Sequence, residues 1–591
     1  MADTIPRRLF EQAKQRPDRP AYLVKENGVW KSTSWAGYAR EVKQAARALV
    51  ALGFQPGQRV CILGFNRPEW VIMDLAAMAA GGAPAGIYTT CSPDEVQYIL
   101  HHSEAPLVLL ENEEQAKKVF AKRAELPALK HVVVMRGPKV DGAMSWDDFM
   151  ARGDSVDARE IDERVEALEP SGLATLIYTS GTTGPPKAVM LNHENLAWTA
   201  GVLRELTKID SGGRTLSYLP LSHIAEQMAS IHGPITGGAA VYFAESIEKV
   251  PENLKEVRPT LFFGVPRIWE KFHAAIAGKL REATGAKAKI AAWARGVGTQ
   301  VSALRARGQA PTGLLAMQYA MANRLVFSKL KEAIGLDQAT VLVSGAAPIS
   351  KEVIDFFGSL DLFVQEIYGQ SEDSGPTTFN LPGRALFGSV GVPLPGVEVK
   401  IAEDDEILVR GKNVFLGYFK DEAATKETLD EQGYLHSGDL GRFDEDGFLH
   451  ITGRKKDIII TAGGKNITPK NIESAVKNHP LVGECVVIGD RRKYLTMLVS
   501  LDPDAAKKFA EEHGVSEPIH QSAKLRESVQ KALDEVNEKL ARVEQVKKFT
   551  LLSRPFGIDT GELTPTLKVK RNVVARNFAQ EIDAMYAGDK D

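Results

Sequence analysis

The chain has 591 residues, which is more than one hydrophobic core usually serves, so more than one domain is expected. Hydrophobic residues make up 44% of the sequence and charged residues 25%, as is typical of a globular protein in water. A formal net charge of −3 argues against nucleic acid as a partner. Cys61, Cys91 and Cys485 are scattered without metal-ligand spacing, so a reduced, cytoplasmic setting is expected.

Neither a secretory signal peptide nor a membrane span is expected. The first ten residues lack an apolar h-region. The most apolar long run, 70–88, contains Asp74 and the break Gly81-Gly82-Ala83-Pro84, so it predicts a packed helix and a strand. This pattern leaves peripheral contact with the cytoplasmic face of a membrane open.

Strand and helix patterns alternate from the first residues to about residue 159. Helices are predicted over 35–52 and 70–80, and short buried strands over 59–64, 85–88, 106–110 and 131–135. Such alternation predicts an α/β fold with largely parallel sheets, and it resumes after residue 192.

The most informative stretch is 178–191. A predicted strand, 173–178, leads into a loop, and Asn192-His193-Glu194-Asn195 looks like the cap of a helix, so the loop is expected to join a strand to a helix. Glycines let backbone N–H groups approach a ligand, hydroxyls add donors and the lysine adds a positive charge, which together suit a polyphosphate. The loop residues are Thr179, Ser180, Gly181, Thr182, Thr183, Gly184, Pro185, Pro186 and Lys187. Walker A spacing fails because two prolines precede the lysine, and a glycine-rich surface turn is the alternative interpretation.

The whole string resembles the phosphate-binding signature of the adenylate-forming (AMP-binding) superfamily, which includes acyl-CoA synthetases, luciferases and the adenylation domains of peptide synthetases. By this resemblance Thr179 to Gly184 and Lys187 bind ATP, and Thr179 is also a Mg²⁺ ligand. The resemblance further implies a large N-terminal domain (1–453) of layered sheets and helices with a small β-rich subdomain. It also implies a hinge (454–457) that pivots at Lys456, followed by a small mobile α+β C-terminal domain (458–591).

Two later strings match the nucleotide-binding motifs of the superfamily. Small residues that admit a flat base form the turn Gly345-Ala346-Ala347-Pro348, and the string around Y-G-x-[ST]-E contributes Glu366, Ile367, Tyr368, Gly369 and Ser371. In the resemblance Tyr368 lies against adenine, Ser371 bonds the α-phosphate and Glu372 binds Mg²⁺. A carboxylate in the first turn of a helix is the other interpretation of Glu372.

The C-terminal half supplies the remaining expected site residues. Asp439 is expected to accept from both ribose hydroxyls, although a generic turn aspartate would look the same, and Arg454 to contact ribose and phosphate. Gly463 and Gly464 are expected to let the arm of CoA pass the backbone. The string Leu563-Thr-Pro-Thr-Leu-Lys568-Val-Lys570-Arg571 matches the long-chain form of the ending, with Lys568 as the catalytic lysine and Lys570 as its rival.

The acyl pocket is predicted from His223, Ile224, Phe263, Gly264 and Gly369. His223 alone would be taken for a structural histidine, but Pro220-Leu-Ser-His223 resembles a segment between the nucleotide and acyl pockets. Glu226 and Gln227 stand where some relatives carry a tryptophan gate, so an aromatic gate is not expected. The string 259–271 resembles long-chain and very-long-chain acyl-CoA synthetases, and 279–335 fits their helical insertion, with solvated charges.

Together these motifs predict a long-chain fatty-acid–CoA ligase that uses ATP, Mg²⁺ and CoA, with Lys568, Glu372, Lys187 and His223 as catalytic residues. A homodimer is also expected. The alternatives are an acyl-AMP ligase that serves a carrier protein, a luciferase-like oxygenase, and a non-catalytic nucleotide- or lipid-binding relative.

Overall fold

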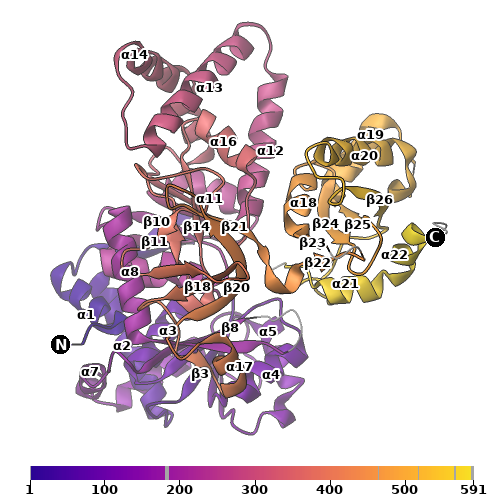
Figure 1. Ribbon diagram of the computed structural model, residues 1–591. Helices are drawn as coiled ribbons and strands as arrows, with labels where there is room; N and C mark the ends of the chain where they lie inside the picture. Colours follow the sequence, from indigo (N-terminus) through magenta and orange to yellow (C-terminus); the bar gives the residue numbers. More distant parts are fainter. Residues whose placement is uncertain (1, 180–184, 463–464, 517, 565–567, 588–591) are drawn as a thin grey trace.

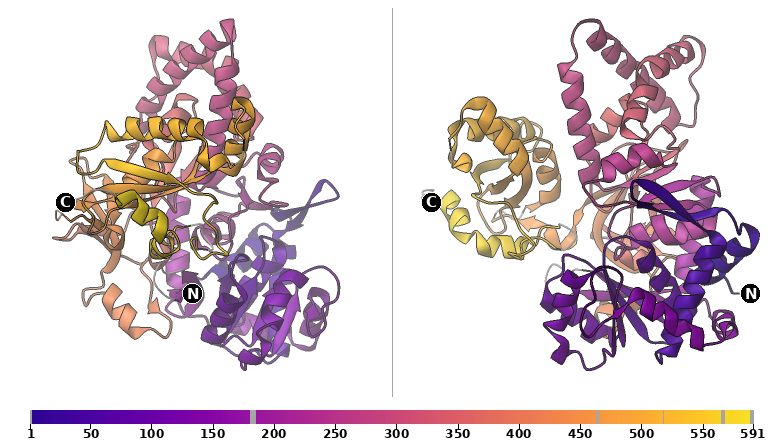
Figure 2. Two further views of the ribbon diagram at one scale, coloured as in Figure 1. Left: turned by 90° about the vertical axis from the view of Figure 1, so that its right-hand side faces the viewer. Right: turned by 180° about the vertical axis from the view of Figure 1, so that it is seen from behind.

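The computed structural model describes residues 2–179, 185–462, 465–516, 518–564 and 568–587. In these ranges the strands form two large sheets, a four-stranded sheet, and one three-stranded and one two-stranded sheet near the C-terminus. Helices cover the large sheets, and the C-terminal part stands beside the main body (Figures 1 and 2). The mixed α/β fold with a large N-terminal and a smaller C-terminal part is therefore as predicted.

The first large sheet carries the phosphate-loop string, in the order β19-β9-β8-β4-β3-β5-β6-β7 among the described residues. Helix α2 (Trp35–Ala51) packs on α3 (Pro68–Ala79), and every residue of α3 from Trp70 onward is buried, so the apolar run 70–88 forms core. The strands are β3 (Arg59–Leu63), β4 (Ala83–Ile87), β5 (Leu107–Leu110), β6 (His131–Val134), β7 (Met144–Ser145), β8 (Leu173–Thr179), β9 (Lys187–Asn192) and β19 (Gly417–Tyr418).

One local expectation about the phosphate loop was wrong. The chain does not pass from the loop straight into a helix, because β9 first returns antiparallel to β8 and pairs Thr179 with Lys187. Helix α8 (His193–Thr207) then begins at the predicted cap, where Asn192 and Asn195 form a reciprocal capping box. The hairpin holds the first and last residues of the loop opposite each other.

The second large sheet has the order β16-β15-β14-β13-β12-β10-β11-β1-β2 in the described chain. Strands β11, β10, β12, β13 and β14 are parallel, so their carboxyl ends share one edge, where ligands of open α/β sheets bind. The strands are β1 (Pro20–Glu26), β2 (Val29–Ser34), β10 (Arg214–Ser217), β11 (Ala240–Phe243), β12 (Leu261–Gly264), β13 (Val341–Ser344), β14 (Val364–Tyr368), β15 (Thr378–Phe379) and β16 (Val392–Pro393).

The predicted β-rich portion is an antiparallel sheet in the order β17-β18-β20-β21. Its strands are β17 (Glu398–Ile401), β18 (Glu406–Arg410), β20 (Leu435–Phe443) and β21 (Leu449–Arg454). A 3-10 turn, Lys455–Asp457, leads from β21 to the C-terminal part.

The C-terminal part has cores of its own. Two hydrophobic clusters draw only on residues from Ile459 onward. Its elements are β22 (Ile459–Ile460), β23 (Asn466–Ile467), α18 (Pro469–Val476), β24 (Val482–Ile488), β25 (Leu495–Leu501), α19 (Pro503–His513), α20 (Ala523–Asn537), β26 (Val546–Leu551), α21 (Arg571–Asn577) and α22 (Ala579–Tyr586). An ion pair joins it to the main body, where Arg267 Nη2 lies 3.0 Å from Asp502 Oδ2.

A helical projection stands beyond the second sheet (Figures 1 and 2). It comprises α12 (Pro266–Glu282), α13 (Gly285–Ala306), α14 (Gly313–Ala322) and α15 (Ser328–Ile334), in keeping with the predicted insertion. The other α-helices are α1 (Ile5–Gln15), α4 (Pro93–Ser103), α5 (Glu113–Phe120), α6 (Trp146–Arg152), α7 (Ala158–Glu166), α9 (Ile224–Gln227), α10 (Gly233–Gly237), α11 (Val250–Val257), α16 (Lys351–Ser359) and α17 (Glu422–Thr428). Of the helices described, none is both long and apolar enough to cross a bilayer.

Candidate active site

Asp439 joins the small antiparallel sheet to the end of β14. Strand pairing sets it opposite Arg454, whose Nε lies 2.7 Å from Asp439 Oδ1. The Tyr368 hydroxyl donates to Asp439 Oδ2 at 3.0 Å. The Asp439 charge is the main cause of the raised pKa of Arg454, and burial followed by the same charge raises the pKa of Tyr368. Three predicted nucleotide residues from two sheets therefore form one hydrogen-bonded group.

Tyr418 forms a second group with Glu372 and Lys187. Its hydroxyl donates to Glu372 Oε1 at 2.8 Å, and Lys187 Nζ lies 4.7 Å from the centre of its ring. Strand β19 pairs with β9, which brings the ring beside the strand that begins at Lys187. The Thr179 hydroxyl donates to the Lys187 carbonyl at 3.4 Å. The predicted metal carboxylate and phosphate lysine thus share one aromatic neighbour.

Lys568 brings the C-terminal part to these groups. Lys568 is exposed to solvent, but protein atoms crowd its ammonium group, and the resulting loss of hydration is the first cause of its lowered pKa. The Arg454 charge lowers the pKa further, while Asp439 and Glu372 act in the opposite direction, so all three lie within electrostatic range of the ammonium. Lys570 occupies the N-cap position of α21 without a side-chain capping bond, and its charge acts on the Cys91 thiol. The charges of predicted site residues thus act on Lys568, whereas the Lys570 charge acts on Cys91.

His223 is held as a neutral imidazole. It caps the short helix α9, and its Nδ1 accepts from the Ala225 backbone N–H at 3.1 Å. Burial, followed by the Lys568 charge, lowers the pKa of His223 to about 4. Because Nδ1 accepts, the single proton of the neutral ring is on Nε2, which is then a donor.

Glycines bring the ends of β12, β13 and β14 together. A Cβ on Gly345 would lie 2.5 Å from Ile367 Cγ2 and 3.4 Å from the Phe263 ring, and one on Gly369 would lie 1.7 Å from the Gly375 carbonyl oxygen. Only residues without a side chain fit there. The indole N–H of Trp269 donates to the Gly264 carbonyl at 3.1 Å, which fixes the end of β12.

The predicted adenine turn is exposed to solvent. Two other predicted residues, Ile224 of the acyl pocket and Ser371 of the nucleotide site, are buried. Ala346, Ala347 and Pro348 are exposed, and Ala346 has a left-handed backbone, φ 65°. The Glu366 carboxyl accepts from the Gly388 N–H at 3.0 Å, and burial raises its pKa to about 8. Lys456 is exposed in the turn after β21. The predicted residues Ser180 to Gly184, Gly463 and Gly464 lie outside the described residues.

A buried carboxyl beside the site was not foreseen from the sequence. Glu226 follows His223 on α9 and is 2% exposed. Its Oε1 accepts from Ser217 Oγ at 2.7 Å, Ser230 Oγ at 2.6 Å and Asn66 Nδ2 at 3.2 Å, and burial raises its pKa to about 8. Position 226, where some relatives carry a tryptophan gate, therefore holds a protonated carboxyl in a polar network. Neither Asn66 nor the serines carry a sequence signal, because they come from other elements.

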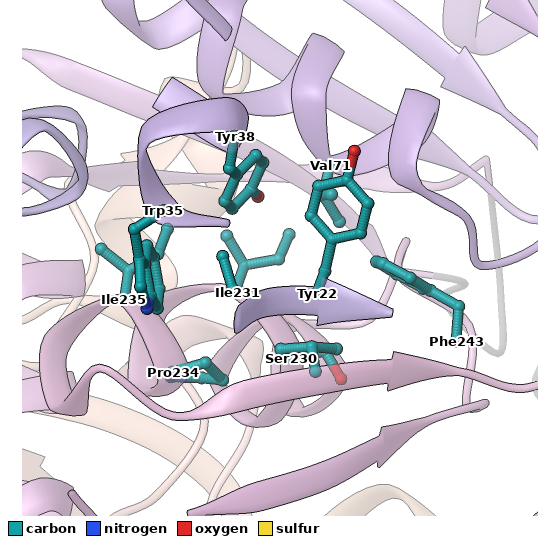
Figure 3. Close-up of a pocket in the computed structure, with 11 residues that line it drawn as sticks. Tyr22, Trp35, Tyr38, Val71, Ser230, Ile231, Pro234, Ile235 and Phe243 are labelled. Atoms are coloured by element: carbon teal, nitrogen blue, oxygen red, sulfur yellow. The ribbon is translucent and has the colours of Figure 1, made fainter. Parts of the chain in front are cut away.

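A small cavity near α2 and β11 borders the Glu226 network at Ser230, which is among the residues that line it (Figure 3). Its volume is about 10 Å³, and Tyr22, Trp35, Tyr38 and Phe243 are among its lining residues. This is room for about one water molecule, so the cavity holds no substrate.

The site lacks a preformed protein cage for a metal. Across the described ranges no cluster of three or more His, Cys, Asp or Glu side chains could hold an ion. Magnesium usually keeps several waters and binds one or two carboxylates together with substrate phosphates. One carboxylate, Glu372 in the 3-10 turn Ser371–Asp373, with the Thr179 hydroxyl at the end of β8 fits that mode of binding.

Comparison with known families accounts for both parts of the chain. The AMP-binding enzyme family matches residues 9–419, and the AMP-binding enzyme C-terminal domain matches residues 456–590. The chain belongs to the AMP-binding enzyme family. The resemblance seen in the motifs is confirmed.

Relatives of this AMP-binding enzyme carry names that specify a substrate. The long-chain-fatty-acid–CoA ligase ACSBG2 of Xenopus laevis is 39% identical, with 99% of this chain and 84% of the relative covered. The long-chain-fatty-acid–CoA ligase FadD15 of Mycobacterium bovis is 37% identical, with 99% and 97% covered.

Solved structures share the fold. The adenylation domain of a carboxylic acid reductase from Segniliparus rugosus, bound to AMP and a co-purified carboxylic acid, matches with a TM-score of 0.75 at 20% identity, covering 99% of this chain and 94% of that one. The anthranilate CoA ligase AuaEII, bound to anthranoyl-AMP, matches with a TM-score of 0.74 at 20% identity, covering 98% of both.

Proposed function

We propose that this AMP-binding enzyme is a long-chain fatty-acid–CoA ligase that forms acyl-CoA in two steps. In the first step a carboxylate oxygen of the fatty acid attacks the α-phosphorus of ATP, and the bond to the β-phosphate oxygen breaks. Acyl-AMP and pyrophosphate result. Negative charge is concentrated around the phosphorus in this step, so nearby cations and donors lower the barrier.

The observation that carries this proposal is the convergence of charges on Lys568. Arg454, Asp439 and Glu372 come from the main body. The charges of all three act on Lys568, which lies between β26 and α21 in the C-terminal part. A lysine there can bond both the fatty-acid carboxylate and the α-phosphate. Its lowered pKa follows from the loss of water, and a bound anion would restore the charged form.

The other residues have complementary roles. Lys187 and the loop Thr179 to Gly184 bind the polyphosphate, the turn 345–348 and Tyr368 hold adenine, and Asp439 binds the ribose. The Nε2–H of His223 donates to the acyl carboxylate or the phosphate. Because the imidazole is neutral, it provides this donor without placing a charge beside the apolar pocket. Glu372 and Thr179 would hold Mg²⁺, which when bound neutralises phosphate charge.

The second step needs a different arrangement around the same acyl group. The CoA thiolate attacks the acyl carbonyl carbon, and the bond to the phosphate oxygen breaks and releases AMP. Lys568 must then leave room for the thiol, so residues 454–457 act as a hinge at Lys456 between domains 1–453 and 458–591. Exposure of Lys456 supports this role. Gly463 and Gly464 would line the path of CoA.

The long-chain specificity rests on the string 259–271 and on the substrate printed in the names of the relatives. Ile224, Phe263, Gly264 and Gly369 would line the acyl pocket beside His223. The test is thioester formation with ATP and CoA across saturated acids of increasing length, with pyrophosphate release followed in parallel. Pyrophosphate without a CoA thioester would favour an acyl-AMP ligase, and silence in both signals would favour a non-catalytic relative.

The role of Lys568 is tested by separating the two steps. Lys568→Ala is expected to lower acyl-AMP formation at least 100-fold while it changes thioester formation from supplied acyl-AMP less than fivefold, because the lysine acts only in the first step. Lys570→Ala is the matched control and should retain both. An equal loss in both steps, or damage confined to Lys570→Ala, would contradict the assignment.

We also propose a cytoplasmic location, since Cys61, Cys91 and Cys485 are all free and buried. Homodimer formation is proposed from the sequence alone and is tested by the mass in solution.

A further inference from the structure

Helix α14 exposes an apolar stripe at the outer end of the helical projection (Figure 1). Leu314, Met317 and Met321 lie at intervals of three and four residues, so they share one face of α14, and Leu325 continues the stripe four residues later in the π-helical segment Asn323–Phe327. Their exposed fractions are 70%, 71%, 57% and 42%. Other large exposed hydrophobic residues, such as Val29 and Val543, lie far from this helix in the sequence.

The opposite face of the same helix already supplies the packing that the projection needs. Leu315, Tyr319 and Ala322 pack with Val297 and Phe327 in a small core shared with α13. Helix α14 itself contains no charged residue, and Gln318 and Tyr319 are the only polar side chains in it. Such a helix is normally covered on every side. Folding therefore explains one face of α14, and a partner is needed to explain the other.

The charges around the stripe identify the kind of partner. Residues 283–331 contain eight lysines and arginines and no aspartate or glutamate, in a chain whose net charge is −3. Arg305 and Lys331 pair with Asp361. Five others are exposed and make no ion pair within the described parts of the chain: Lys287, Lys289, Arg307, Arg324 and Lys329. The partner thus combines negative charge with an apolar interior.

We infer that the projection docks on an anionic lipid bilayer, with Leu314, Met317, Met321 and Leu325 entering the headgroup region and the basic side chains contacting lipid phosphates. Apolar insertion and attraction to anionic lipid reinforce each other in interfacial helices. A second copy of the chain is a poorer partner, because it would bring two basic surfaces together. The purpose of the docking rests on the proposed function, since long-chain acids partition into membranes.

Vesicle binding tests the inference without any substrate. The full-length protein is sedimented with vesicles of equal phosphatidylcholine and phosphatidylglycerol, and with phosphatidylcholine alone. We expect binding to the anionic vesicles that weakens with salt, and at least tenfold weaker binding for the variant Leu314→Ser/Met317→Ser/Met321→Ser. The matched control, Val29→Ser/Val543→Ser, removes equally exposed apolar side chains elsewhere and should bind within twofold of wild type.

A labelled residue locates the contact directly. The three native cysteines are buried, so Met317→Cys can be labelled selectively with an environment-sensitive fluorophore. Nitroxide-labelled lipids in anionic vesicles should quench it, whereas the same label on Val29→Cys should stay unquenched. Absence of quenching at position 317 would overturn the inference.

The remaining outcomes are equally decisive. Unchanged vesicle binding by the triple variant, or no binding by the wild type, refutes the docking surface. A wild-type dimer that the triple variant converts to monomer would show that a second copy covers the stripe, which also refutes it. Thioester formation from a long-chain acid dispersed in detergent, without vesicles, is measured in parallel. Its failure alone counts against the proposed function, and failure of vesicle binding alone counts against the docking surface.

Discussion

Replacing Tyr418 by phenylalanine is expected to slow acyl-AMP formation roughly 10- to 150-fold while the fold is preserved. The change removes the hydroxyl that donates to Glu372 Oε1 at 2.8 Å, but it keeps the ring under Lys187 Nζ. A hydrogen bond to a charged group contributes about 1.5–3 kcal/mol, which gives that range if the bond is fully used in the transition state. The loss should appear in kcat/KM for ATP, because Glu372 is proposed to act on the phosphates.

A second tyrosine offers a control with the same local chemistry. The Tyr434 hydroxyl donates to Glu398 Oε1 at 2.6 Å, and Lys400 Nζ lies 4.5 Å from its ring centre. This group lies in the small antiparallel sheet, where no predicted site residue contacts it. Tyr434→Phe should therefore lose a similar bond without losing activity. Melting temperature, which reports folding, should fall by similar small amounts in both variants.

The assay is pyrophosphate release under single-turnover conditions, in the presence of fatty acid and without CoA. An effect smaller than threefold for Tyr418→Phe, or an equal loss in Tyr434→Phe, would refute the claim that Tyr418 positions Glu372. Tyr418→Leu separates the two contributions, because it also removes the aromatic face under Lys187. We expect it to be slower than Tyr418→Phe by about fivefold, from a cation–π contribution of about 1 kcal/mol.

Two further changes test buried features of the site. Burial raises the pKa of Glu226 to about 8, so the folded protein keeps a proton that the unfolded chain releases from about pH 4.5 upward. The free energy of unfolding therefore falls by on the order of 5 kcal/mol as the pH rises from about 4.5 to about 8. Glu226→Gln should remove this part of the pH dependence, and urea unfolding at pH 5 and pH 8 checks it; parallel wild-type and variant curves would contradict the protonated carboxyl. Gly369→Ala should cost more than 2 kcal/mol and most activity, because its Cβ would lie 1.7 Å from the Gly375 oxygen. The control is Gly278→Ala on α12, where nothing lies within 4 Å and the change should stabilise by about 1 kcal/mol; an equal response of both glycines in thermal unfolding would sink the close-contact argument.

Local sequence signals predicted most of the elements near the site. The strand before the phosphate loop was predicted from a short apolar run, and the cap at Asn192 from its side-chain chemistry. These features depend on neighbours within a few residues. The hairpin that pairs Thr179 with Lys187 was missed because strand pairing across a turn of uncertain length leaves no periodic signal.

The ordered motifs indicate which chemistry the chain can perform, whereas the tertiary structure decides which residues surround each reactive group. The motifs by themselves determined the family and the candidate residues, because phosphate, metal and ribose binding demand particular residue types at short spacings. Tyr418 is 46 residues from Glu372 and 231 from Lys187, and Asn66 is 160 from Glu226, so only folding reveals that they meet. The sequence of α14, which has no charged residue, likewise does not show which face of the helix is exposed. Burial and long-range contact belong to the whole fold, and no window of sequence contains them.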